Sequence, residues 1–308
     1  MPQSEYLTPL DFKKFKMDKL LSLTGIQIKA KAYIELIKLK LTLAVVFSGV
    51  FGYCLAADTL IWWKLAVLIV ASISITGAAN VINQIIEKES DKVMKRTAGR
   101  PLPTGRLTVR EAATFAFILF GIACFLFIEV FNIRSAALAV LSLLLYGFVY
   151  TPLKTKGQVA VWIGALPGAF PPMIGWVAAT NHFGWAPGIL FAIQFFWQFP
   201  HFWAIGWLAF DEYKKAGIQM MPGDGKTTET AFRIMIYTLF LIPVGWLPYM
   251  LGMTGINSAL VAMVGGILFL AQTFHLMRTC TDKAALQMMF GSLLYLPIVQ
   301  IVYLIDKV

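Results

Sequence analysis

The sequence predicts an all-α integral membrane protein with about nine transmembrane helices and a cytoplasmic N-terminus. Three observations lead to this fold class. Of the 308 residues, 58% are hydrophobic and only 14% are charged, with a mean hydropathy of +0.72, whereas soluble domains carry about 25% charged residues. Apolar runs long enough to cross a bilayer recur along the chain. The basic residues between these runs gather strongly on alternate connections.

Nine apolar runs have about the 20-residue length that crosses the hydrocarbon core. They cover residues 34–56, 62–86, 111–130, 133–152, 159–179, 186–209, 231–252, 256–277 and 286–305. Only Phe131 and Asn132 separate the third and fourth spans, which are therefore expected to form a tight antiparallel hairpin. The basic and polar first 30 residues lack the features of a signal peptide.

The distribution of lysine and arginine predicts the orientation. With nine spans, only three of the 26 basic residues, Lys64, Arg134 and Lys307, fall on one side of the membrane. Cytoplasmic connections carry the excess of basic residues, so the N-terminus is expected in the cytoplasm and the C-terminus outside. The net charge of +10 is then a topology signal. It does not indicate nucleic-acid binding, because the chain has no soluble basic domain to carry it.

Two regions follow from this reading: a basic cytoplasmic segment over residues 1–32 and a transmembrane domain over residues 33–308. Residues 7–31 mix Leu and Phe with lysines, which favours an amphipathic helix on the anionic inner leaflet; a solvated tail is the alternative. Three cysteines lie in different spans or span ends without metal-ligand spacing, and they are expected to be buried apolar residues. They are Cys54, Cys124 and Cys280.

Three oxygen-bearing side chains, Asn83, Glu87 and Asp91, form what we call the first motif, at the inner end of the second span. Their i, i+4, i+8 spacing places them along one helical face. Hard oxygen ligands suit Mg²⁺, which binds through one or two carboxylates together with substrate phosphates. A solvated helix end paired with lysines is the alternative. Ionisable groups that emerge from a membrane span are functional candidates, which favours the metal site.

A basic loop over residues 95–106 follows the first motif directly. Its cations include Lys95, Arg96 and Arg100. Arginine presents a planar donor fork that matches phosphate oxygens, and lysine adds a compact charge. Some of these charges serve positive-inside anchoring. Two prolines stiffen the loop, so the sequence predicts a structured, anion-binding segment.

Two further groups of polar residues end spans on the same predicted side. Tyr150 and Lys154 end the fourth span, and the sixth span is followed by the second motif, Asp211 and Glu212, and then by Tyr213 and Lys214. An interfacial tyrosine, a topology lysine and a solvated helix end are the alternatives. The inner ends of spans 2, 4 and 6 lie on one face, so these residues are expected to converge.

Two membrane segments carry unusual residues. His201 lies in the sixth span within Trp197–Trp203, where it either is a satisfied core residue or faces a large ligand. The fifth span contains Pro171 and Pro172 among small residues. Such a run opens a helix where the backbone lines a cavity, or it allows close helix packing.

These motifs resemble those of the UbiA superfamily of membrane prenyltransferases, and the resemblance covers essentially the whole chain. It rests on the first motif, the Arg-Pro-Leu-Pro-Thr-Gly-Arg run over residues 100–106, and the pair Tyr150 and Lys154. The double-proline run and the Pro-His-Phe segment at residues 200–202 are similar to the branch that farnesylates heme b.

The resemblance implies nine helices around a central, lipid-open cavity and an enzyme of the bacterial inner membrane with its site facing the cytoplasm. It implies Mg²⁺-dependent transfer of farnesyl from farnesyl diphosphate to a vinyl group of heme b, which gives heme o and diphosphate. Downstream partners would be heme A synthase or cytochrome oxidase assembly.

The resemblance also implies roles for single residues. The first and second motifs would hold metal, and Asp91, Tyr150 and Lys154 would act in catalysis. Substrate-binding residues would be Lys95, Arg96, Arg100, His201, Tyr213 and Lys214. The chain departs from the family pattern at two positions. Glu87 stands where Asp is usual, which lengthens the side chain but keeps the charge, and Lys215 stands four residues beyond Asp211, which makes the second metal position less secure than the first.

Two other functions stay open at this stage. One is a prenyltransferase for an aromatic quinone precursor. The other is a secondary transporter, whose sites lie near the bilayer midplane on broken helices. The carboxylates of this chain lie at span ends, which counts against transport, although the double proline of the fifth span leaves room for it.

Overall fold

The computed structural model describes residues 25 and 27–308, and these residues form α- and π-helices without a β-strand. The predicted amphipathic helix over residues 7–31 lies largely outside the described residues. The elements of the first half are α2 (Leu39–Ala56), α3 (Trp62–Ile86), α4 (Lys88–Val93), α5 (Val109–Leu126), η1 (Phe127–Phe131), α6 (Ile133–Leu144), η2 (Leu145–Tyr150), α7 (Thr151–Leu153) and α8 (Val159–Thr180). Those of the second half are α9 (Trp185–Leu208), α10 (Phe210–Lys215), α11 (Thr228–Leu239), α12 (Leu241–Met250), α13 (Ile256–Thr279) and α14 (Asp282–Ile305).

Eight helical spans of the described chain are long and apolar enough to cross a membrane. They coincide with eight of the nine predicted spans. The predicted sixth span corresponds to α9, which is 24 residues long but falls outside these eight. Its Gln, Trp and His side chains make it less apolar than its neighbours. The all-helical membrane fold is thus confirmed, while the ninth crossing and the orientation stay predictions.

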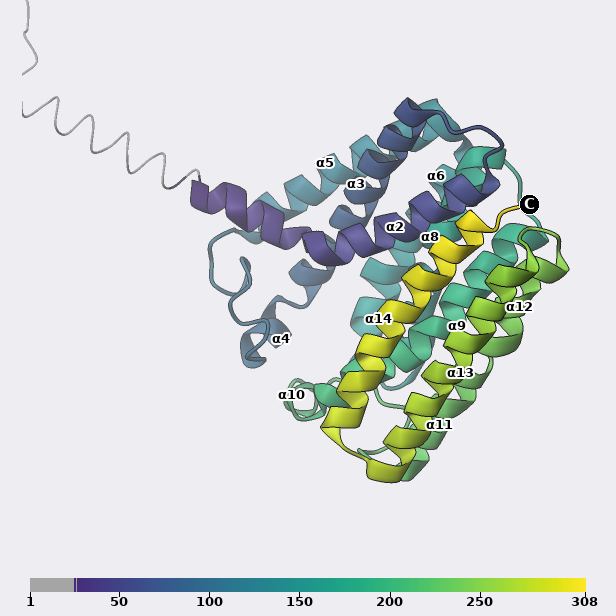
Figure 1. Cartoon of the computed structure of the whole chain (residues 1–308). Helices are drawn as coiled ribbons and strands as arrows, with labels where there is room; N and C mark the ends of the chain where they lie inside the picture. Colours follow the sequence, from purple (N-terminus) through teal and green to yellow (C-terminus); the bar gives the residue numbers. More distant parts are fainter. Residues whose placement is uncertain (1–24, 26) are drawn as a thin grey trace, which may run out of the picture.

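Helix α8 joins two groups of helices (Figure 1). On one side it packs against α2 and α6, and α3 packs between α2 and α5. On the other side it packs against α9, which contacts α11, α12 and α14, while α13 packs on α11, α12 and α14. The short helices α4 and α10 lie close together at one end of the molecule, and the C-terminus lies at the other (Figure 1).

Close backbone contact between α2 and α8 explains the small residues of the fifth predicted span. A Cβ atom at Gly175 would lie 1.9 Å from the carbonyl oxygen of Gly49, and one at Gly52 would lie 2.0 Å from that of Pro172. Helix α8 continues through its prolines, with Pro171 and Pro172 buried. The prediction that these prolines open the helix was therefore wrong. The alternative prediction, close helix packing, is confirmed.

Local breaks divide two of the predicted spans, and a predicted turn is confirmed. The first span, expected over residues 34–56, breaks at Lys38, which has φ 50° and ψ 57°, and α2 starts after it. The seventh divides between α11 and α12 at Phe240, because Pro243 clashes with the carbonyl four residues before it. Asn132 makes the expected tight turn, where its side chain accepts a hydrogen bond from Ser135 N at 2.8 Å.

The three cysteines are free and half-buried, less enclosed than expected. At the end of the molecule that holds the C-terminus, Lys307 donates hydrogen bonds to the carbonyl oxygens of Cys54 and Ala57. Asp306 accepts one from Ser258 N at 2.7 Å. These contacts join the end of α14 to the end of α2 and to the start of α13. The polar residues of the motifs lie at the opposite end, with α4 and α10.

Candidate functional site

A cavity of about 350 Å³, which we call the charged pocket, opens where α3, η2 and the loops around α4 and α10 meet. Its charged lining consists of four basic side chains and two carboxylates, so a dianionic ligand would balance it. The lining residues are Lys38, Leu41, Asn83, Glu87, Asp91, Met94, Arg96, Thr97, Arg100, Tyr146, Tyr150, Lys154, Tyr213, Ile218 and Met220.

The first motif runs through the junction of α3 and α4. Helix α3 ends at Ile86, but the i, i+4 backbone bonds continue: Glu87 N donates to Asn83 O at 2.9 Å, and Asp91 N donates to Glu87 O at 2.8 Å. The helical spacing therefore holds across the junction, and all three side chains line the charged pocket. Asp91 has no exposed surface.

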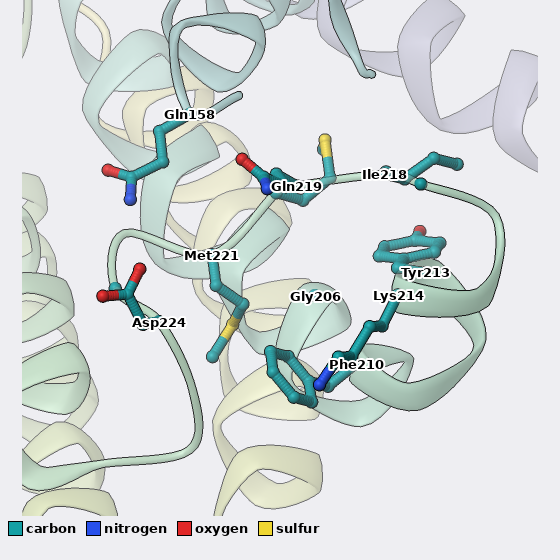
Figure 2. Close-up of a pocket in the computed structure, with 12 residues that line it drawn as sticks. Gln158, Gly206, Phe210, Tyr213, Lys214, Ile218, Gln219, Met221 and Asp224 are labelled. Carbon is teal, nitrogen blue, oxygen red and sulfur yellow. The ribbon is translucent and has the colours of Figure 1, made fainter. Parts of the chain in front are cut away.

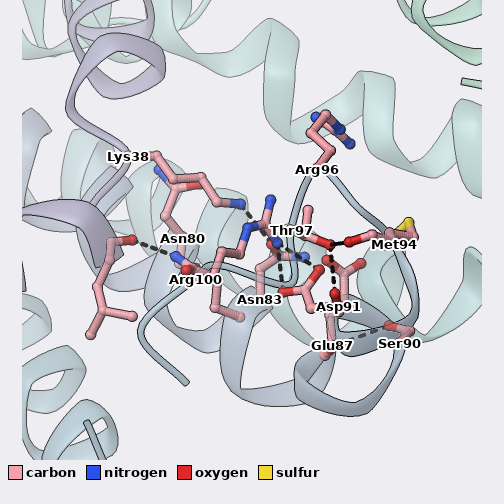
Figure 3. Close-up of polar contacts among 12 residues, drawn as sticks. Lys38, Asn80, Asn83, Glu87, Ser90, Asp91, Met94, Arg96, Thr97 and Arg100 are labelled. Atoms are coloured by element: carbon pink, nitrogen blue, oxygen red, sulfur yellow. Dashed lines mark hydrogen bonds and ion pairs between the residues drawn. The ribbon is translucent and has the colours of Figure 1, made fainter. Parts of the chain in front are cut away.

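Each member of the first motif accepts a hydrogen bond from a basic side chain, as Figure 3 shows for the first and third pairs. The pairs, with their N···O distances, are Lys38–Asn83 at 2.9 Å, Lys154–Glu87 at 2.7 Å and Arg100–Asp91 at 2.6 Å. Among the residues that the structure describes, two of these three cations, Lys154 and Arg100, have an anionic partner. Lys38 stands on a neutral amide oxygen.

Burial and neighbouring charges shift the pKa values of two lysines of this pocket, in opposite directions. Burial lowers the pKa of Lys38 to about 7, and the nearby Arg100 and Lys154 add to the effect. Burial also opposes the charged form of Lys154, but the Glu87 carboxylate outweighs it, so the pKa of Lys154 lies above its ordinary value. A cation destabilised by like charges is one that an arriving anion would stabilise.

The π-helix η2 positions Tyr146 and Tyr150, which lie within it, and Thr151, which follows it directly. Tyr146 and Tyr150 lie with their ring centroids 5.4 Å apart, and Lys154 Nζ stands 4.6 Å from the centre of the Tyr150 ring. Thr151 Oγ1 donates to Tyr146 O and accepts from Asn83 Nδ2 at 3.1 Å. This bond fixes the Asn83 amide so that its oxygen faces the cations. Short π-helices are frequent at functional sites.

The structure brings Arg96 and Tyr213 together but leaves other predicted residues outside the charged pocket. Arg96 donates to Tyr213 Oη at 3.5 Å, which joins the basic loop to α10. Lys95 and Asp211 are exposed, and Glu212 lines neither cavity described here. A second metal at Asp211 and Glu212 therefore stays a prediction. No three His, Cys, Asp or Glu side chains converge as a metal cluster within residues 25 and 27–308.

A second, smaller cavity of about 210 Å³ adjoins the charged pocket (Figure 2). Tyr213, Ile218 and Met220 line both cavities and form the wall between them. Lys214, predicted to bind diphosphate, lies on this second cavity.

His201 lies apart from both cavities, in the middle of α9. Its ring stacks on that of Trp197 with centroids 4.6 Å apart, and its Nδ1 is bonded to Ser292 Oγ at 2.8 Å. The histidine is thus held by two helices with one ring nitrogen engaged. Its role toward a ligand stays a prediction.

Lys38 and Tyr146 are among the lining residues that the sequence motifs do not include. By sequence alone, Lys38 is equivalent to Lys40, and both fit the positive-inside pattern. Nothing in the sequence around it separates the two, because its direction depends on contacts with α3. Tyr146 stands four residues before Tyr150, so the helical spacing that groups Tyr150 with Lys154 would have found it.

Comparison with known proteins finds a matching family and close relatives for most of the chain. Residues 45–294 match the model of the UbiA prenyltransferase family. The protoheme IX farnesyltransferase of Cytophaga hutchinsonii is 54% identical over 281 residues, which are 90% of this chain and 98% of that one. The protoheme IX farnesyltransferase of Christiangramia forsetii is 43% identical, with 89% and 92% of the two chains covered.

Solved structures share the fold at lower identity. A structure of digeranylgeranylglyceryl phosphate synthase superposes with a TM-score of 0.74 at 22% identity, covering 90% of this chain and 98% of that one. The structure of a UbiA homologue from Archaeoglobus fulgidus bound to GPP and Mg²⁺ gives a TM-score of 0.65 at 12% identity, covering 89% and 99%. At these identities the likeness concerns the fold alone.

Proposed function

Because the chain belongs to the UbiA prenyltransferase family, we propose that it transfers a farnesyl group from farnesyl diphosphate to a vinyl group of heme b, giving heme o. The relatives named protoheme IX farnesyltransferase match about nine tenths of this chain and more than nine tenths of their own length. The observation that carries the proposal is the charged pocket. Its four cations and oxygen-bearing first motif suit a diphosphate.

The first motif fits Mg²⁺. Asn83, Glu87 and Asp91 offer amide and carboxylate oxygens, the hard ligands that this ion takes together with substrate phosphates. The orientation of the Asn83 amide suits this role. Its nitrogen donates to Thr151 Oγ1, which leaves its oxygen facing the pocket. Prenyl transferases of the same fold bind this ion, as the homologue with GPP and Mg²⁺ illustrates. When bound, the ion neutralises charge on the diphosphate and makes it a better leaving group.

The remaining lining residues serve the bond that breaks. Lys154 and Arg100 would bind diphosphate oxygens and stabilise the charge that develops as the C–O bond opens and its electron pair moves to the leaving group. The rings of Tyr146 and Tyr150 offer π faces to the allylic cation left behind. Apolar helices on the membrane side exclude water from this cation.

The acceptor then supplies the electrons of the new bond. The π pair of the heme vinyl group would attack the allylic carbon and form a C–C bond. Water would add to the cation that results on the vinyl carbon next to the ring and would release one proton. The sum of the steps consumes heme b, farnesyl diphosphate and water, and it yields heme o and diphosphate.

The reaction would take place on the cytoplasmic side of a bacterial inner membrane. Support comes from the basic residues, all but three of which fall on the side of the charged pocket when nine spans are counted. The product would pass to heme A synthase or to cytochrome oxidase assembly, the steps that consume heme o.

A product assay tests the proposal. Purified protein is incubated with heme b, farnesyl diphosphate and Mg²⁺, and the product is identified by mass spectrometry. We expect the mass of heme b plus one farnesyl group and one hydroxyl, and its loss when the metal is chelated. A product with an aromatic quinone precursor in place of heme b, and none with heme b, would assign the chain to another acceptor.

A further inference from the structure

We infer that Lys38 is a further substrate-binding residue, whose ammonium group binds the diphosphate of the prenyl donor. This inference rests on the proposed function. Lys38 precedes α2 and is 45 residues from its hydrogen-bond partner Asn83 in sequence. It belongs to none of the motifs that predicted the site, yet it lines the charged pocket together with the first motif.

A break in the helix before α2 sets the direction of the Lys38 side chain. Residues 27–36 are helical, and α2 resumes at Leu39. Between them Lys38 adopts a left-handed conformation with φ 50°, which costs a non-glycine residue about 1 kcal/mol or more. Strain of this kind persists only where the surroundings enforce it. In a continuous helix the Lys38 side chain would point in a different direction.

Polar side chains of α3 enforce the break. Gln84 Nε2 donates to Leu36 O at 2.6 Å, and Asn80 Nδ2 donates to Ile37 O at 3.1 Å. These two carbonyl groups lose helical partners at the break, so the amides satisfy them. Thr42 Oγ1 adds a bond to Ile37 O at 2.6 Å. Figure 3 shows Lys38 next to Asn80 and Asn83 of α3. One face of α3 thus holds both the first motif and the turn that presents Lys38.

The charges of the pocket explain what Lys38 would bind. Lys154 and Arg100 each stand on a carboxylate, whereas Lys38 makes its hydrogen bond with the neutral Asn83. Among the described residues, Lys38 has no carboxylate within ion-pair distance. Arg96 donates to the Tyr213 hydroxyl and likewise has no carboxylate partner within the described part of the chain. A diphosphate between them and the first motif would supply the missing anion.

Paired lysine variants test this assignment. Lys40, two residues further on, is exposed and lines neither cavity, so Lys40→Met is the matched control for Lys38→Met. The probe is a non-reactive farnesyl thiodiphosphate analogue. Its Kd is measured on each purified protein in detergent, once with Mg²⁺ and once with EDTA. Lys38→Arg restores the charge, and thermal unfolding shows that each variant is folded.

We expect Lys38→Met to weaken analogue binding about tenfold or more with and without metal, as loss of a charge-assisted hydrogen bond does. Lys40→Met should stay within about twofold of the wild type, and Lys38→Arg should recover most of the affinity. Unchanged affinity in Lys38→Met, or a loss confined to the Mg²⁺ condition, would overturn this inference alone, since the latter means that Lys38 only orients Asn83. Failure of the wild-type protein to bind the analogue would overturn the proposed function as well.

Discussion

At Asp91 a carboxylate with no exposed surface meets a single arginine. Both of its oxygens accept from Arg100 Nη1, at 2.8 and 2.6 Å. Burying a carboxylate is costly unless a cation pairs with it and donates hydrogen bonds to it. This pair also ties the basic loop to the first motif, so the same residue serves the loop's structure and the pocket's chemistry.

Asp91→Asn should abolish farnesyl transfer, with a loss of at least about 100-fold, while the protein stays folded. Asparagine keeps an oxygen that can accept from Arg100 but loses the charge that a metal needs. Product formation and Mn²⁺ binding followed by EPR, with Mn²⁺ as a probe for Mg²⁺, would measure both effects. The control is Glu89→Gln in the same helix. Glu89 is exposed and forms an exposed ion pair with Lys92, so this variant should change little. Full activity of Asp91→Asn would contradict the metal assignment.

At the scale of elements, the contact between α2 and α8 fixes how the two groups of helices meet. At Gly52 and Gly175 backbone meets backbone, and a backbone atom cannot move aside as a side chain can. Such close approach suits helices in lipid, where packing and not hydrophobicity drives association. Because Lys38 immediately precedes α2, this contact also sets the position of the turn that carries it.

Gly175→Ala should destabilise the protein by about 1–3 kcal/mol, the usual cost of overpacking. The added methyl would meet the Gly49 carbonyl at 1.9 Å, which forces the two helices apart. Unfolding in detergent, followed by circular dichroism, would measure the loss. Gly188→Ala in α9 is the control, since a Cβ there meets nothing within 4 Å. Equal stability of the two variants would argue against a tight α2–α8 contact.

For the whole molecule, the charge distribution separates two ends. The charged pocket, α4 and α10 lie at one end, and the C-terminus lies at the other (Figure 1). A bilayer around this bundle would leave the pocket at one membrane surface. That arrangement brings a soluble diphosphate head and a lipid-soluble prenyl tail to the same place.

Reporter fusions should place the two ends on opposite sides. Green fluorescent protein fluoresces in the cytoplasm but not after export through the general secretory route. A fusion at the N-terminus is therefore expected to be bright. Alkaline phosphatase, active only outside, should be active after Val308. Both results require an odd number of crossings and so would establish α9 as a span. A dark N-terminal fusion, or a cytoplasmic C-terminus, would contradict the predicted topology.

Composition and apolar run length determined the membrane class and the approximate position of every long helix, because the length of a span is set by the bilayer. The i, i+4 spacing of the first motif likewise determined its common face. The first motif, Tyr150 and Lys154 were thus available from local periodicity. The position of Asp211 and Glu212 was not, since it depends on how α10 leaves α9.

Only the tertiary structure decided that Lys38, and not Lys40, lines the pocket. Lys38 and Lys40 carry the same charge two residues apart, and the sequence treats them alike. They are separated by a helix break that the amides of Asn80 and Gln84 stabilise from another helix. Long-range hydrogen bonds of this kind have no local signature. The sequence by itself therefore determined the membrane helices and the oxygen ligands, whereas the packing of α3 against the break before α2 decided that Lys38 faces those ligands.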